Sequence, residues 1–190
     1  MRYGVGLMIV LLLAGGCASP PARYYRLSPA NVPAAAPSHG SVAVGPVSIP
    51  ALVDRPQIVV SAGPNEVRVD EFNRWASPLA DDIARVVAEN LFVMLGTPRV
   101  MLYSQGTADD AQFRVAIGVQ RFDSAPGEAA SLDAVWSVQR RQDGASESGR
   151  TMVREPVAGE GYDALAAAHS RALERLSRDI ANAIGVFAKS

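Results

Sequence analysis

Two histidines and one cysteine are the residues with which nucleophilic or metal chemistry would begin in this chain of 190 residues. His39 lies in a proline-rich stretch, and His169 lies in a helical pattern where we expect it on the surface or partly buried. No Gly-x-Ser-x-Gly elbow, phosphate-binding loop or dinucleotide fingerprint accompanies them. The two histidines have no metal-ligand spacing, and one cysteine can form neither a zinc site of cysteines nor an intramolecular disulfide. The sequence therefore predicts a protein that is not an enzyme and binds no metal or cofactor.

The cysteine, Cys17, stands at the end of an export signal. Arg2 supplies a positive start, residues 5–14 form an apolar run, and the segment ends in Leu13-Ala14-Gly15-Gly16-Cys17. An apolar run of about ten residues is half the length that a transmembrane helix needs. The ending resembles the lipobox of bacterial lipoproteins, whose cysteine thiol receives a diacylglyceryl group. We therefore predict a signal peptide over residues 1–16 and a covalent lipid on Cys17; an ordinary signal peptide with a free thiol is the alternative.

The composition excludes some partners. The chain is 48% hydrophobic and 19% charged, with a formal net charge of −1. A nucleic-acid surface needs clustered Lys and Arg to replace the counterions of the phosphates, and no such cluster is present. We therefore expect no nucleic acid as a partner.

The region after Cys17 is expected to tether the folded part to its lipid. Residues 18–21 and 29–41 are rich in Pro, Ala, Ser and Gly, which favours extended or disordered chain. Between them, residues 23–27 have the alternation of a short strand that docks on the domain. The expected organisation is a lipidated N-terminal tether over residues 17–40, then a single domain over residues 41–190.

Changes of hydrophobic period divide this domain into helices and strands. Ser77 suits a helix cap, Pro78 suits the first helical position, and Gly96 suits a helix end, which predicts a helix over about 78–95. A second helix is expected from about Leu165 to Phe187. Strand candidates cover residues 42–49, 57–61, 66–70, 99–103, 112–122, 132–139 and 149–155, and short loops favour a hairpin and an antiparallel meander. We predict an α+β fold with a mostly antiparallel or mixed sheet of about six strands and both main helices packed on one face.

Two clusters are candidates for contact with a partner. Asp54 and Arg55 lie between Pro50 and Pro56 just after a strand, where a rigid turn can present both side chains. Trp75 lies on the approach to the first helix. Two interpretations stay open: these side chains satisfy local hydrogen bonds and seal the core, or they shape a surface for a partner protein or lipid.

The order of these motifs resembles the ABC-type transport auxiliary lipoproteins, the PqiC-like family of outer-membrane lipoproteins. One departure is Leu52-Val53, where family members tend to carry tyrosine and then leucine. The residues that carry the resemblance, in addition to Cys17, are Tyr25, Leu27, Pro50, Asp54, Arg55, Trp75, Pro78 and Leu79.

The resemblance implies a component of a phospholipid transport system, anchored in the outer membrane and facing the periplasm. Ala18, rather than aspartate, follows the cysteine, which fits the sorting of outer-membrane lipoproteins in enterobacteria. The implied partners are a transport protein of the mammalian-cell-entry type and inner-membrane transporter components, with phospholipid contact and a homo-oligomer as further expectations. The alternative is a structural or assembly lipoprotein of the outer membrane or of a secretion channel. Transport predicts an apolar groove or channel, and assembly does not.

Overall fold

The computed structural model describes residues 20–33, 35, 40–103 and 110–187. Their helices and strands follow the order β1 (Arg23–Tyr25), β2 (Val42–Ser48), β3 (Gln57–Ser61), β4 (Val67–Trp75), α2 (Leu79–Leu95), β5 (Val100–Leu102), β6 (Phe113–Ala125), β7 (Ala129–Arg140), β8 (Ser146–Pro156) and α3 (Gly161–Phe187).

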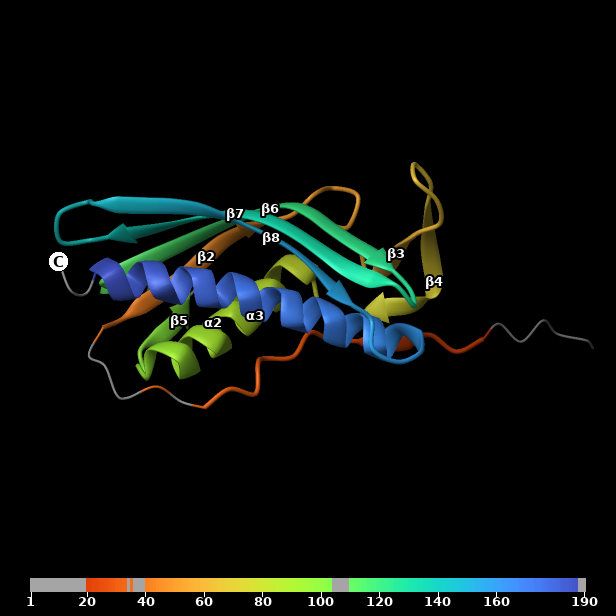
Figure 1. Ribbon diagram of the computed structural model, residues 1–190, viewed down its shortest axis with the longest axis horizontal. Coiled ribbons are helices and arrows are strands. Elements are labelled where there is room, and N and C mark those ends of the chain that lie inside the picture. Colours follow the sequence, from red (N-terminus) through yellow and green to blue (C-terminus); the bar gives the residue numbers. More distant parts are fainter. Residues whose placement is uncertain (1–19, 34, 36–39, 104–109, 188–190) are drawn as a thin grey trace, which may run out of the picture.

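The strands form two sheets, and the predicted α+β class is confirmed (Figure 1). The larger sheet has the order β5-β2-β6-β7-β8, in which β6, β7 and β8 are an antiparallel meander and β2 runs parallel to both β5 and β6. The smaller sheet has the order β1-β4-β3. The strands are therefore divided between two sheets instead of forming one, because β3 and β4 pair as a hairpin and add β1 at the other edge.

The helices lie on one side of the larger sheet (Figure 1). Helix α3 packs on β7 and β8, α2 packs on β2 and β5, and the two helices pack on each other. Helix α2 begins and ends within a residue of the predicted bounds, with Gly96 in the left-handed conformation at φ 64°. Pro78 is the N-cap rather than the first helical residue, and its carbonyl accepts a hydrogen bond from the Asp82 N–H at 3.0 Å.

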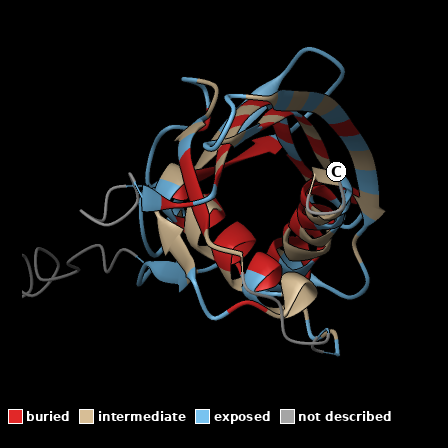
Figure 2. Cartoon of the chain, turned by 90° about the vertical axis from the view of Figure 1, so that its left-hand side faces the viewer, coloured by how far each residue is buried: buried red, intermediate tan, exposed pale blue. Residues whose placement is uncertain are grey.

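The core lies between the larger sheet and the helices. Figure 2 shows the buried residues on the inward sides of the strands and helices. Because strands alternate and helices repeat every 3.6 residues, each element contributes one apolar face. The largest fully buried apolar side chains are Leu27, Ile58, Leu79, Ile83, Leu91, Phe113, Leu132, Leu165, Leu173, Leu176 and Ile180.

The N-terminal segment, residues 20–33, docks on both helices instead of standing free of them. The N–H of Leu27 donates to Asp82 Oδ2 at 2.8 Å, and the N–H of Ala30 donates to Asn90 Oδ1 at 2.7 Å, both on α2. On α3, Ser170 Oγ accepts the N–H of Ser28 at 3.0 Å. Part of the expected tether is therefore held on the domain, because α2 and α3 present polar side chains to its backbone.

The long axis of the molecule has two different ends (Figure 1). At the first, which we call the β1 end, β1 and β4 meet the start of α3, where Tyr162 Oη donates to Asp70 Oδ2 at 2.5 Å. At the second, which we call the pocket end, the turn between β7 and β8 meets the end of α3, where Arg140 Nη1 donates to the Phe187 carbonyl at 2.9 Å.

Candidate functional site

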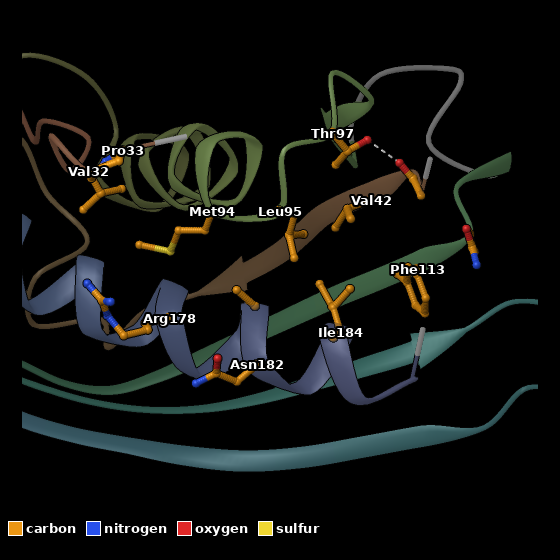
Figure 3. A pocket seen from close by; sticks show the side chains of 14 residues that line it. Val32, Pro33, Val42, Met94, Leu95, Thr97, Phe113, Arg178, Asn182 and Ile184 are labelled. Carbon is orange, nitrogen blue, oxygen red and sulfur yellow. Dashed lines mark hydrogen bonds between the residues drawn. The ribbon is translucent and has the colours of Figure 1, made fainter. Parts of the chain in front are cut away.

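A cavity of about 860 Å³ lies at the pocket end (Figure 3). Its walls come from the last turn of α2, the starts of β2 and β6, the last turns of α3, and the docked N-terminal segment. Most of the lining is apolar. The apolar side chains that line it are Val32, Pro33, Val42, Met94, Leu95, Phe113, Ala181 and Ile184.

Polar groups are few and lie among these walls. Thr97 Oγ1 donates a short hydrogen bond to the Gly40 carbonyl, which fixes the wall between α2 and β2 (Figure 3). Arg178 and Asn182 line the cavity from α3, and Arg178 Nη2 donates to Glu174 Oε1 at 2.7 Å. A cavity of this size, with mostly apolar walls and a few polar groups, has the character of a small-ligand site. It can take an apolar chain, and the Arg178 guanidinium, although paired with Glu174 through Nη2, has further N–H groups that can donate to an anionic group.

None of the predicted site residues that the structure describes lines this cavity. The helical periodicity that includes Met94 and Ile184 marks only an apolar helix face. A wall of a pocket and a wall of a core have the same sequence signal, because each needs apolar side chains at helical spacing. Sequence reasoning missed the site for that reason.

The cluster around Asp54 forms an exposed turn. The Val53 N–H donates to the Pro50 carbonyl at 3.0 Å, and the Arg55 N–H donates to the Val53 carbonyl at 2.9 Å. Val53 enters the core, whereas Asp54 and Arg55 are exposed. The turn presents both charged side chains at the surface, and their contact with a partner stays a prediction.

Trp75 has a structural position. Its side chain is buried, and its ring meets those of Phe122 and His169 edge-on at centroid distances of 6.1 Å each. Its backbone N–H donates to the Pro56 carbonyl at 2.7 Å, which joins the Asp54 turn to the end of β4. Leu79, at the start of α2, is buried as well. These positions agree with the interpretation that Trp75 seals the edge of the core.

Tyr25 and Leu27 lie beside this edge. Tyr25 is the register partner of Trp75 in the β1–β4 pair, and its hydroxyl donates to Asn73 Oδ1 at 3.0 Å. Its ring lies 5.7 Å from that of Tyr162, centroid to centroid. Burial and the hydrogen bond to Asp70 raise the pKa of Tyr162 to about 12, so its hydroxyl stays a donor at physiological pH. The structure thus gathers Tyr25, Trp75 and the Asp54 turn at the β1 end; Cys17 lies outside the described residues.

His169 is fully buried, contrary to the expected surface or partly buried position. Its ring stacks on Phe122 at 3.9 Å between centroids, and its Nε2 lies 2.8 Å from Ser124 Oγ. Burial lowers its pKa to about 3. Its Nδ1 has no hydrogen-bond partner among the described residues. A serine-histidine pair without a carboxylate on Nδ1 lacks the orienting acid of a hydrolase triad, and this pair is sealed in the core.

Comparison with known proteins assigns the family. Residues 25–181 match the family described as ABC-type transport auxiliary lipoprotein component. The chain belongs to this family. The matched region of this transport auxiliary lipoprotein contains the N-terminal segment from Tyr25 on, strands β2 to β8, α2 and most of α3.

Solved structures share the fold of the lipoprotein. A crystal structure of an uncharacterized protein is 20% identical, with a TM-score of 0.69 over 87% of this chain and 99% of that one. A DUF330-family protein from Xanthomonas campestris is 22% identical, with a TM-score of 0.62 over 83% and 92%. A PelC dodecamer from Paraburkholderia phytofirmans is 15% identical, with a TM-score of 0.41 over 79% and 91%, too low to support an argument. No curated protein matches the chain.

The described residues contain neither a candidate metal site nor a candidate membrane-spanning helix. No group of three or more His, Cys, Asp or Glu side chains in that part of the lipoprotein is placed to hold a metal ion. Neither α2 nor α3 combines the length and the apolar character that crossing a membrane requires.

Proposed function

We propose that this lipoprotein is a non-catalytic component of a system that moves phospholipid between the two membranes of the envelope. It is held in the outer membrane by the lipid on Cys17 and faces the periplasm. There it docks a conduit protein of the mammalian-cell-entry type, which connects it to the inner-membrane transporter. The observation that carries this proposal is the family match over residues 25–181.

The cavity supports a lipid contact in this role. Its apolar lining suits an acyl chain, because each methylene removed from water contributes about 0.8 kcal/mol. Arg178 suits an anionic headgroup or carboxylate, since guanidinium groups pair well with both. The lipoprotein would hold one chain of a phospholipid here while the lipid passes between the conduit and the outer membrane.

The position of the cavity agrees with such a transfer. The N-terminal segment leaves the domain at the β1 end, and the elements whose residues line the cavity meet at the opposite end of the long axis (Figure 1). A conduit that arrives from the inner membrane would therefore meet the end that holds the cavity. The exposed turn with Asp54 and Arg55 lies at the β1 end, so it would contact only a partner that reaches along the domain toward the membrane.

A crosslinked pull-down from native envelopes tests this proposal. The full lipoprotein is recovered after crosslinking, and mass spectrometry identifies the proteins and phospholipids that accompany it. We expect to recover a mammalian-cell-entry protein and phospholipid, and we expect Cys17→Ala to reduce the recovery of both. Recovery of outer-membrane assembly or secretion proteins alone would favour the alternative role in assembly.

The purified lipoprotein, without crosslinking, tests the expected homo-oligomer. A ring-shaped conduit is best matched by a ring of identical lipoproteins, and light scattering of the lipidated protein measures its mass directly. A monomer at high concentration would count against the ring and leave the docking role to single subunits.

A further inference from the structure

The lipid anchor is close to the folded domain. Only Ala18, Ser19, Pro20, Pro21 and Ala22 separate Cys17 from Arg23, the first residue of β1. A fully extended chain spans at most about 3.5 Å per residue, so the backbone of Arg23 lies within roughly 20 Å of the backbone of Cys17. If Cys17 carries a lipid, β1 is therefore held near the membrane surface.

Contacts of the docked segment keep this connection short. In the parallel β1–β4 pair, Arg23 is the register partner of Asn73. Further along, Leu27 donates to Asp82 through its N–H, and its carbonyl accepts from Arg85 Nη2 at 2.7 Å. Release of β1 would lengthen the connection, and these bonds oppose that release.

The β1 end presents aromatic and basic side chains together. Tyr24 is 64% exposed and Phe72 on β4 is 41% exposed. Tyr24 is the register partner of Arg74, and strand alternation places this pair on the face opposite Tyr25 and Trp75, which pack inward. Arg26, just after β1, is exposed, and Arg23 is exposed on the face of Tyr25. Two acidic side chains are close: Glu71 Oε2 lies 3.8 Å from Arg74 Nη2, and Asp70 Oδ1 accepts the backbone N–H of Phe72 at 3.0 Å.

This combination suits a lipid surface. Tyrosine and other aromatic side chains are favoured at the level of the headgroups, where an apolar ring body and a polar edge are both satisfied. Arginine pairs with phosphate through two parallel hydrogen bonds. A basic residue near an anionic membrane contributes about 1 kcal/mol to binding, and a covalent lipid makes such weak contacts effective by keeping them close.

The geometry points to a membrane-contact patch, formed by Tyr24, Phe72, Arg26 and Arg74, that lies against the headgroups of the membrane holding Cys17. The β1 end then faces this membrane and the pocket end faces away from it. This inference rests on the proposed lipid anchor, and it adds an orientation that the anchor alone does not give.

Site-directed fluorescence on the full lipidated protein in vesicles tests the patch. The vesicles contain phosphatidylethanolamine, phosphatidylglycerol and a lipid with a spin label at its headgroup. Because Cys17 is the only cysteine and its thiol is acylated, an introduced cysteine is the one free thiol of the mature chain. A bimane label is placed at Glu71→Cys beside the patch or at Val186→Cys at the pocket end. These positions are matched, since the Glu71 side chain and Val186 are each 62% exposed.

We expect lipid quenching at position 71 to exceed that at position 186 several-fold. Tyr24→Ser with Phe72→Ser, in the Glu71→Cys protein, is expected to reduce the quenching to the value at position 186. Equal quenching at the two positions, or no effect of the double substitution, would overturn the patch. A label at position 71 that is shielded from an aqueous quencher but untouched by the lipid quencher would assign the surface to a second copy of the chain instead.

Flotation of the same vesicles separates this inference from the proposed function. Protein that floats with the vesicles, and fails to float as Cys17→Ala, has its lipid anchor. If the protein floats but the labels at positions 71 and 186 are quenched equally, the patch is overturned and the lipid anchor is not. Protein that does not float would overturn the anchor and, with it, the patch.

Discussion

The backbone N–H of Leu27 donates a hydrogen bond of 2.8 Å to the carboxylate of Asp82, 55 residues further along the chain. Arg85 donates to the other oxygen of the same carboxylate at 2.6 Å and to the Leu27 carbonyl at 2.7 Å. Both backbone polar groups of the fully buried Leu27 are thereby satisfied. This closed arrangement joins the N-terminal segment to α2 and determines how much chain is left between Cys17 and the domain.

Asp82→Ala is expected to lower the free energy of unfolding by about 2 kcal/mol, because it leaves the buried Leu27 N–H without its charged acceptor. Urea denaturation measures this change. Trypsin should also cleave faster at Arg23 and Arg26, since the segment that contains them loses a main attachment.

Asp81→Ala is the matched control for this variant. Asp81 is exposed in the same first turn of α2, so its loss removes a favourable helix-dipole interaction worth less than about 1 kcal/mol. Equal effects of the two substitutions would show that the helix start, and not the bond to Leu27, is what Asp82 stabilises.

His169 is expected to make stability depend on pH. Its pKa is about 3 in the folded protein and 6.5 in the unfolded chain, so between these values the unfolded chain binds a proton that the folded one excludes. The free energy of unfolding therefore has its full value above pH 6.5 and falls as the pH drops. The loss is about 2 kcal/mol between pH 6.5 and pH 5. Urea denaturation across this range should show the loss in the native sequence and a flatter curve in His169→Gln.

The variant His169→Gln is a fair comparison because glutamine is uncharged and can still bond to Ser124. His39 is present in both proteins, so its titration cancels. Parallel curves for the two proteins would mean that His169 is not the group that titrates.

Gly149→Ala is expected to destabilise the larger sheet. The Trp136 ring lies over Gly149, so that an added Cβ would overlap it. Trp136 Nε1 donates to Thr151 Oγ1 at 3.2 Å, and a displaced ring would break this bond. Overpacking of this kind costs roughly 1–3 kcal/mol. Urea denaturation measures the loss, and a reduced near-ultraviolet circular dichroism signal would report the movement of the tryptophan.

Gly185→Ala is the control substitution for this experiment. An added Cβ at Gly185 meets no heavy atom within 4 Å, and alanine is the better helix former. We expect a gain of up to about 1 kcal/mol. A similar loss in both variants would argue against the role of the Trp136 ring.

Ala181→Phe is expected to weaken the binding of a fluorescent fatty acid such as cis-parinaric acid. The larger side chain would fill part of the cavity that Ala181 lines. Displacing two methylenes of the ligand costs about 1.6 kcal/mol, which weakens binding by roughly tenfold. Fluorescence titration measures the affinity.

Val186→Phe is the control for the cavity. Val186 lies on the same helix, is 62% exposed and does not line the cavity. Its substitution should leave the affinity unchanged. If Ala181→Phe binds the fatty acid as tightly as the native chain, the acyl chain lies elsewhere.

Some parts of the lipoprotein could be predicted because their causes are local. Helix α2 lies within a residue of its predicted bounds because Pro78 and Gly96 act within one turn of the helix ends. The hairpin of β3 and β4 follows from the turn residues between them. The motifs around Tyr25, Asp54 and Trp75 were enough to recognise the family.

Other parts depend on elements that are distant in sequence. The burial of His169 follows from Phe122 and Ser124 on β6, and the docking of residues 27–30 follows from Asp82, Asn90 and Ser170. Sequence reasoning had no access to these pairings, because a polar residue on a helix has the same local pattern whether it faces water or a docked segment.

The sequence by itself determined the α+β class and the family, since these depend on residue order and local periodicity. The export signal with its cysteine stays a prediction. Only the tertiary structure decided the division into two sheets, the short connection between Cys17 and β1, and the cavity. The cavity is a space left between the ends of α2 and α3 and the starts of β2 and β6. Such a space arises where packed elements diverge from one another, so the sequence pattern of a single element does not show it.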